Sequence, residues 1–173
     1  MDFFETIRKR HSVREFLPKG VENEKIEKIL EAANHAPSAG NNQGYEIVVL
    51  EEPLRIIELL KSLVDQKFEK PAPVVLVFCA NEKRSEVTFG ARGKSLYGIQ
   101  DASFAGAYAQ LAAAGLGLAS VWVGAFRDED IRKIIAAPDH IRPVGLLSIG
   151  YPAVDPTSTP RRQLTELVHR DKY

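Results

Sequence analysis

The sequence predicts a layered domain of the α/β class, and three observations lead to this expectation. Short apolar runs alternate along the chain with segments whose apolar residues recur at helical spacing, as in helices packed on a sheet. One of the runs, 74–80, is apolar without interruption, which is typical of a strand buried on both faces. The length of 173 residues suits one domain of ordinary size. The pattern leaves the direction of the strands open.

The N-terminal part of the chain predicts two helices and a short extended piece. Residues 2–9 place apolar side chains on one side of a short helix, and residues 14–16 are expected to be extended. A longer helix is expected at 23–36, where apolar residues recur at helical spacing: Ile26, Ile29, Leu30 and Ala33. Asn23 is a suitable N-cap for this helix, and Pro37 stops it.

The middle of the chain predicts two strands, a helix and a long connection. The strands are expected at 46–50 and at the apolar run 74–80. Between them Pro53 opens a helix that continues to about Lys67. Residues 81–98 show little periodicity and contain three glycines, so we expect a long loop or lid there.

The C-terminal part predicts the remaining layers and an arm. A helix rich in small residues is expected at 99–114, strands at 119–124 and 144–150, and an amphipathic helix at 129–136. Small residues let helices approach closely, so the 99–114 helix is expected to pack against another chain. The tail, 152–173, contains three prolines and is expected to be an extended arm of a single domain that spans 1–173.

Composition excludes several classes of protein. The 23 Lys and Arg residues balance the 23 Asp and Glu residues, so no overall charge attracts nucleic acid or a membrane surface. No apolar run reaches the roughly 18 residues of a membrane span. The N-terminus does not resemble a secretory signal, and the single Cys79 forms no intramolecular disulfide. We therefore expect a cytoplasmic protein without a nucleic-acid or membrane partner.

A basic segment follows the first helix. Residues 10–16 read Arg-His-Ser-Val-Arg-Glu-Phe and place two arginines and a serine within five residues. Alternation in an extended segment puts residues 10, 12 and 14 on one face. Arginines in that arrangement suit a phosphate, which they bind through charge-assisted, bidentate bonds. The alternative is a solvated basic turn, in which Arg10 interacts with the C-terminus of the helix.

Two further segments are informative. Residues 37–43, Pro-Ser-Ala-Gly-Asn-Asn-Gln, form a loop between helix and strand that offers amide donors and acceptors, although composition alone would fit an ordinary turn. Residues 115–126 carry paired glycines after a helix and before a strand. A dinucleotide-binding fingerprint has the reverse order, so this segment argues against a Rossmann site.

These segments together resemble the FMN-dependent nitroreductase family, whose members have an Arg-(Arg/His)-Ser-x-Arg-x-Phe segment and then a Pro-Ser-x-x-Asn-x-Gln loop. The resemblance spans nearly the whole chain, in the expected order. It implies a three-layer α-β-α nitroreductase-like fold with a mixed sheet and helices on both faces, which some schemes class as α+β. It also implies an intertwined homodimer with FMN in the subunit interface.

The resemblance also implies the cofactor contacts. The 37–43 loop would reach the flavin of the other subunit, and backbone groups past the 119–124 strand would face flavin N5. The implied contacts are Arg10, His11, Ser12, Arg14, Pro37, Ser38, Ala39, Asn41, Gln66, Val123, Gly124, Ala125, Arg161 and Arg162. Two departures are visible: Gly44 stands where the family often has Pro, and the tail segment 159–162 lacks the Lys of the family's Lys-x-Arg.

Other reactive residue types have structural explanations. Trp122 is expected in the core, Cys79 as an inert buried thiol, and Asp101 as a cap or a buried polar contact. The four histidines are scattered, so no metal site is expected. No acid/base pair or hydrolase motif is present, and a flavin enzyme needs none because the chemistry occurs on FMN N5. We therefore expect no catalytic side chain.

The implied function is that of an NAD(P)H-dependent FMN oxidoreductase, reducing nitroaromatic, quinone or related small-molecule acceptors by a ping-pong mechanism. Alternatives are a flavin-binding carrier or sensor without turnover, a nucleotide-binding dimer that uses the arginines for another ligand, and a reductive dehalogenase-type or flavin-degrading member of the same fold. Phe89, Arg92 and Tyr97 of the 81–98 segment are candidates to line the acceptor pocket. The sequence leaves open the acceptor, the preference between NADH and NADPH, and the pathway.

Overall fold

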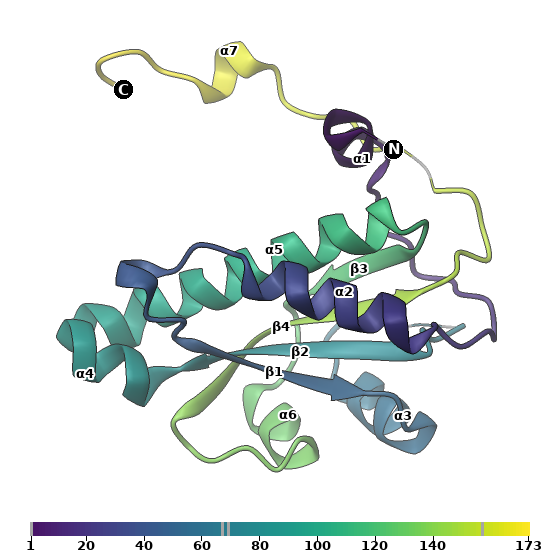
Figure 1. The fold of residues 1–173 in the computed structure, drawn as a ribbon, viewed down its shortest axis with the longest axis horizontal. Helices are drawn as coiled ribbons and strands as arrows, with labels where there is room; N and C mark the ends of the chain where they lie inside the picture. Colours follow the sequence, from purple (N-terminus) through teal and green to yellow (C-terminus); the bar gives the residue numbers. More distant parts are fainter. Residues whose placement is uncertain (1, 67, 69, 157) are drawn as a thin grey trace.

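Four strands form one sheet in the computed structural model, which describes residues 2–66, 68, 70–156 and 158–173 (Figure 1). The strand order is β1-β2-β4-β3, and each neighbouring pair is antiparallel. The strands are β1 Tyr45–Leu50, β2 Val74–Asn81, β3 Ala119–Val123 and β4 Ile141–Gly150. β2 and β4 pair from Val74–Ile149 to Asn81–Ile141, with a shift of register between Phe78 and Cys79.

The N-terminal segment gives the sheet its mixed character. Ser12 forms a parallel bridge with Ser120 of β3, and Glu15 forms a second parallel bridge with Lys70. The Val13 amide donates to the Ser120 carbonyl at 3.1 Å. The basic segment is therefore fixed along the outer edge of β3.

Helices α2, Asn23–Asn34, and α5, Gly98–Gly115, cover one face of the sheet (Figure 1). Their apolar sides meet alternate residues of the strands, among them Leu76, Phe78 and Leu147, in one buried core. This is the arrangement expected where each strand presents every second side chain to each face.

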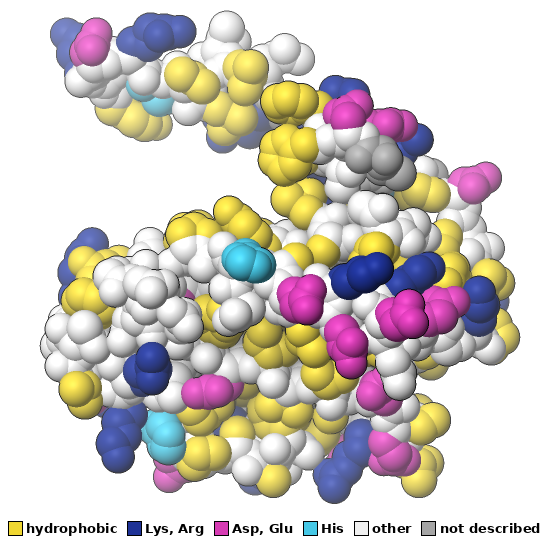
Figure 2. Space-filling model, in the orientation of Figure 1, with side chains coloured by type: hydrophobic (Ala, Val, Ile, Leu, Met, Phe, Trp, Pro, Cys, Tyr) yellow, Lys and Arg dark blue, Asp and Glu magenta, His cyan; other side chains and the backbone are white. Residues whose placement is uncertain are grey.

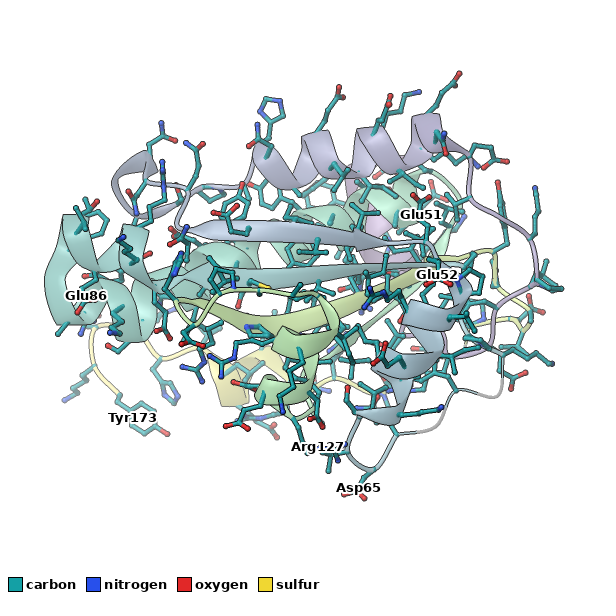
Figure 3. All side chains as sticks on the ribbon, turned by 90° about the horizontal axis from the view of Figure 1, so that it is seen from below. Glu51, Glu52, Asp65, Glu86, Arg127 and Tyr173 are labelled. Atoms are coloured by element: carbon teal, nitrogen blue, oxygen red, sulfur yellow. The ribbon has the colours of Figure 1, made fainter. Side chains whose placement is uncertain are left out.

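Helices α3, Pro53–Lys61, and α6, Asp128–Ile134, cover the opposite face and complete three layers (Figure 3). Glu52 precedes α3, and its carboxylate accepts hydrogen bonds from the backbone amides of Leu54 and Arg55 at 3.0 and 3.1 Å. Proline at the first helical position completes this N-terminus. The α/β expectation with helices on both faces is confirmed.

Short elements lie around these layers. The first helix is α1, Phe3–Lys9, and the arm after β4 carries the single-turn helix α7, Leu164–Leu167. In Figure 1 the arm leaves the sheet, passes beside α1 and extends over α5. No helix within the described residues is long and apolar enough to cross a membrane.

The expectation of a loop at 81–98 was wrong. Residues Glu82–Arg92 form helix α4, and Gly93–Tyr97 form a π-helical turn that leads directly into α5. The Asn81 side chain caps α4 by accepting from the Arg84 amide at 3.0 Å. Gly90, at φ 61°, kinks the helix. Ser85 is its only buried residue, so the helix has no apolar face whose spacing could have revealed it.

Two helix boundaries also differ from expectation. Helix α3 ends at Lys61 because Leu63 leaves it to pair with Phe126, so Gln66 does not lie in the helix, and Lys67 lies outside the described residues. Asn23 is the first residue of α2 and not its N-cap. Glu22 occupies the cap position, and its carboxylate accepts from the Tyr151 hydroxyl and not from the helix amides.

The small residues of α5 pack within their own chain. Ala102, Ala105, Ala109 and Ala113 are fully buried in the core shared with α2 and the sheet. The expectation that this face meets another chain was therefore wrong. Small side chains at these positions instead let α5 lie close to the sheet and to α2. The exposed side of α5 carries Phe104 and Tyr108.

Candidate functional site

A cavity of about 560 Å³ lies between the basic segment, α5, β3 and the arm. Its volume falls within the roughly 300–1,000 Å³ of small-molecule sites. The lining residues are Arg10, His11, Ser12, Arg14, Gln110, Trp122, Thr159 and Arg161. The structure thus brings five of the predicted contact residues to one place, four from the basic segment and one from the arm.

The backbone of the basic segment explains how its side chains reach this cavity. Val13 and Phe16 are buried on the core side, whereas Ser12 and Arg14 are exposed on the other. Residues 10, 12 and 14 all line the cavity, as the sequence predicts, but His11 lines it too, so the alternation holds only from Ser12 to Arg14 around the buried Val13.

The cavity is strongly basic. Its lining includes three arginines and no carboxylate, and among the described residues none of these arginines forms an ion pair or a hydrogen bond with an acidic side chain. Burial lowers the pKa of Arg10, and the nearby positive charge of Arg161 lowers it further. Like charges held together without a counter-ion characterise an anion-binding site.

Trp122 forms the apolar wall of the cavity. One side of its indole packs against Phe78, at 5.7 Å between ring centroids, and against the Cα positions of Gly106 and Gly145. A Cβ at either glycine would overlap the indole, so these glycines make room for it. Trp122 packs against the core, as the sequence predicts, and its ring also lines the cavity, which the sequence did not predict.

Gln66 and the segment after β3 lie together. The Val64 amide donates to the Ala125 carbonyl at 2.9 Å, which holds the 63–66 segment against residues 123–126. Gly124 and Ala125 are exposed there. The side-chain oxygen Oε1 of Gln66 is buried and has no hydrogen-bond partner among the described residues. A buried acceptor of this kind calls for a donor.

The 37–43 loop lies elsewhere on the same chain. It is held near Asp101 in the first turn of α5, whereas the cavity reaches Gln110 of that helix. At 1.5 Å per residue these positions are about 13 Å apart along the axis. The structure therefore does not bring Pro37, Ser38, Ala39 and Asn41 to the basic cavity of their own chain.

Helix α4 packs on that loop. Phe89 lies against Gly40, where an added Cβ would be 3.0 Å from its ring. Phe89 also meets Tyr97 edge to face, and the Tyr97 hydroxyl accepts a hydrogen bond from Arg92 at 3.0 Å. The three candidates for an acceptor pocket therefore form one cluster beside the loop.

Arg162 does not line the cavity. Its guanidinium pairs with Glu166 at 3.5 Å and donates to the carbonyl of the same residue. Of the two tail arginines, only Arg161 lines the cavity.

Sequence reasoning missed three residues of the cavity: Trp122, which it placed in the core, Gln110 and Thr159. Gln110 could have been found because it is one of few polar side chains in a helix rich in alanine. Thr159 carries no comparable signal, since its place depends on the path of the arm.

Other reactive groups match their structural explanations. Burial raises the pKa of the Cys79 thiol to about 12, so the thiol is protonated and inert. The carboxylate of Asp101 is buried and bonded to backbone amides. Within the described residues, no cluster of His, Cys, Asp and Glu could hold a metal ion.

Comparison with known proteins identifies similar chains. The family model described as the nitroreductase family matches residues 7–151. The FMN reductase [NAD(P)H] of Bacillus subtilis is 29% identical over 176 residues, which cover 94% of this chain and 70% of that protein.

Solved structures are similar over the full chain. A nitroreductase family protein from Clostridium difficile 630 is 32% identical, with a TM-score of 0.88 and all of both chains covered. An FMN-dependent nitroreductase from Clostridium difficile R20291 is 28% identical, with a TM-score of 0.81, and 98% of this chain and 99% of that one are covered.

Proposed function

We propose that this chain, which belongs to the nitroreductase family, is an NAD(P)H-dependent FMN oxidoreductase. The proposed acceptors are nitroaromatics, quinones or related small molecules. The relatives named as an FMN reductase and as an FMN-dependent nitroreductase support the choice of cofactor and donor. The proposal takes residues 1–173 as one FMN-binding domain with 152–173 as its arm.

The basic cavity carries the proposal. Arg10, Arg14 and Arg161 line it together, and no acidic side chain among the described residues neutralises them. The phosphate of FMN would provide that counter-charge, because a dianion placed among guanidinium groups accepts several charge-assisted hydrogen bonds.

The other predicted contacts also fit FMN. The unpaired Oε1 of Gln66 suits an N–H donor such as the one at the pyrimidine edge of the flavin ring. Gly124 and Ala125 are exposed on the adjoining segment, where the Ala125 carbonyl already accepts from Val64, so contact with the same ring would come from the other backbone groups there. The residues present therefore fit the cofactor at its phosphate and at its ring.

Each part of the site then has a role. When bound, FMN supplies the redox chemistry between the nicotinamide nucleotide and the acceptor. The arginines hold the phosphate, Trp122 provides an apolar wall, and Gln66 orients the ring. No side chain is assigned as acid or base. We expect donor and acceptor to use one site in turn, which gives ping-pong kinetics.

We further propose a homodimer with FMN at its interface. Large apolar side chains are exposed on α1, on the arm and on α5: Phe3, Phe4, Phe104, Tyr108, Leu164, Leu167 and Val168. Figure 2 shows apolar side chains gathered along the arm, and an open space between the arm and the helical face below it. A second copy would cover these surfaces and bring its 37–43 loop to the FMN.

A titration of the purified protein with FMN tests the proposal. Trp122 is the only tryptophan and lines the cavity, so bound FMN should quench its fluorescence. NADH or NADPH should then bleach the visible flavin bands in an anaerobic stopped-flow experiment, and double-reciprocal plots should be parallel. Absence of binding contradicts the FMN site. Bound flavin that neither nucleotide bleaches contradicts the oxidoreductase and leaves a carrier or sensor.

A further inference from the structure

Asp101 is a buried carboxylate that reaches across to another part of the chain. Only 1% of the residue is exposed. Its Oδ1 accepts from the Ala39 amide at 2.9 Å, and its Oδ2 accepts from the Gly44 amide at 3.1 Å. No cation pairs with it among the described residues, so the negative charge is directed at these two amides.

The two amides mark the ends of a strained loop. Between them Gly40, Asn41 and Gln43 have φ angles of 52°, 57° and 48°. Residues other than glycine adopt this left-handed backbone conformation only at a cost in free energy. The surrounding structure must therefore hold Asn41 and Gln43 in it. Asp101 fixes the entry and the exit of that loop through its two oxygens.

The packing around Gly44 shows how closely the exit is held. A Cβ at Gly44 would run into the Ser85 hydroxyl and would lie 3.2 Å from Asp101 Oδ2. Glycine is therefore the residue that lets the backbone approach the carboxylate. The family often has proline at this position. Proline has no amide hydrogen to donate to Asp101, so this hydrogen bond explains why the chain has Gly44 there instead.

Helix α4 holds the outer side of the same loop. Arg84 Nε donates to the Asn42 carbonyl at 2.6 Å, and the Thr88 hydroxyl lies 3.1 Å from Asn42 Oδ1. Inside the loop, the Ser38 hydroxyl oxygen accepts from the Gln43 amide at 2.9 Å. The loop is thus fixed from the core by Asp101 and from the surface by Arg84.

We propose that Asp101 is a positioning residue, which holds the 37–44 loop in the conformation that presents Pro37, Ser38, Ala39 and Asn41 to the flavin. The inference rests on the proposed function. Asp101 is too deeply buried to touch a ligand, so it acts only through the loop backbone. Arg84 supports the same conformation from α4.

Asp101→Asn tests this proposal in the full-length protein. The amide keeps one acceptor oxygen but places an NH₂ group against the second backbone amide. We expect the Kd for FMN to rise about tenfold, the fold-change of one lost charge-assisted hydrogen bond, and the visible circular dichroism of bound FMN to change. Asp139→Asn, at an exposed site on the far side of the sheet, should change neither.

The readouts separate the possible outcomes. Wild-type protein that does not bind FMN contradicts the proposed function itself. Wild-type protein that binds FMN, with an Asp101→Asn variant that equals it in Kd and in the flavin spectrum, overturns the positioning role even if the variant melts earlier. Should Asp101→Asn fail to fold, Arg84→Ala, which removes only the exposed contact with Asn42, takes its place. An unchanged Kd for FMN in Arg84→Ala would then overturn the proposal, and an increase would support it.

Discussion

Arg10 and Arg161 both line the basic cavity, and burial together with the charge of Arg161 lowers the pKa of Arg10. The two guanidinium groups come from opposite ends of the chain, one after α1 and one from the arm. Their repulsion is a cost of folding that an anion between them would remove. The arm is therefore expected to be held more firmly when the anion is bound.

Arg10→Ala separates the role of this pair in binding from its role in folding. The variant should bind FMN more weakly by about 1.5–3 kcal/mol, the value of a hydrogen bond to a charged group. Without FMN it should be at least as stable as the wild type, because the repulsion is gone. Fluorescence titration and thermal melting measure the two effects. Arg142→Ala, which removes an arginine paired with Asp128 on the other side of the sheet, is the control and should leave FMN affinity unchanged.

Gly106→Ala should disturb the wall of the cavity. The added Cβ would overlap the Trp122 indole, so the ring must shift toward the cavity. We expect a loss of about 1–3 kcal/mol in the free energy of unfolding, and a shift in tryptophan emission. Gly115→Ala in the same helix is the matched control, because its Cβ would meet only Thr6 Cγ2 at 3.9 Å. Equal stability of the two variants would show that the indole does not occupy this place.

Because of the contact between Glu22 and Tyr151, the free energy of unfolding should depend on pH in acidic solution. The Tyr151 hydroxyl donates to the Glu22 carboxylate, and this bond, with smaller effects of the backbone and of Lys25 and Lys19, lowers the pKa of Glu22 to about 2. Because the pKa of Glu22 is lower in the folded state than its ordinary value of 4.5, the ionised carboxylate stabilises the folded protein at pH values above 4.5. This contribution disappears as the pH falls from 4.5 to 2.

Tyr151→Phe should remove that contribution. The melting temperature of the variant should lie below that of the wild type at pH 6, and the difference should vanish near pH 2. Tyr173→Phe at the exposed C-terminus should follow the wild type throughout. A difference that stays constant between pH 6 and pH 2 would contradict the role of Glu22.

Gly90→Ala should destabilise the kink of α4 although space is available. No atom lies within 4 Å of the added Cβ, but Gly90 has φ 61° and ψ −152°, a region nearly restricted to glycine. The expected loss is about 1–3 kcal/mol in the free energy of unfolding. Gly20→Ala, also in open space but without a positive φ, should cost less than that. Chemical denaturation of the two variants measures the difference.

Features that depend on only a few neighbouring residues could be predicted from the sequence. The alternation around Val13 placed Ser12 and Arg14 on one face because a buried apolar residue separates exposed polar ones. The uninterrupted apolar run 74–80 predicted the central strand β2. In both cases a few neighbouring residues contain all the information.

Features that depend on distant residues could not be predicted in this way. Helix α3 stops early because Leu63 pairs with Phe126, and α2 lacks its expected cap because Glu22 bonds with Tyr151. Helix α4 could not be recognised because it buries only Ser85 and therefore has no apolar face at helical spacing. The sequence placed Asp101 as a cap or buried contact, but not at the amides of Ala39 and Gly44, which only the tertiary structure brings to it.

The position of β4 has a consequence for synthesis on the ribosome. β4 is the last strand of the sheet in the chain, yet it lies between β2 and β3 and pairs with both. Until residues 141–150 have emerged, β3 can pair only with the short segment at Ser12 and Val13, and the edge of β2 that joins β4 stays unpaired. A nascent chain that stalls before that point exposes unpaired edges, which favour aggregation. Completion of this sheet therefore follows translation of its final strand, and the arm with Arg161 emerges only afterwards.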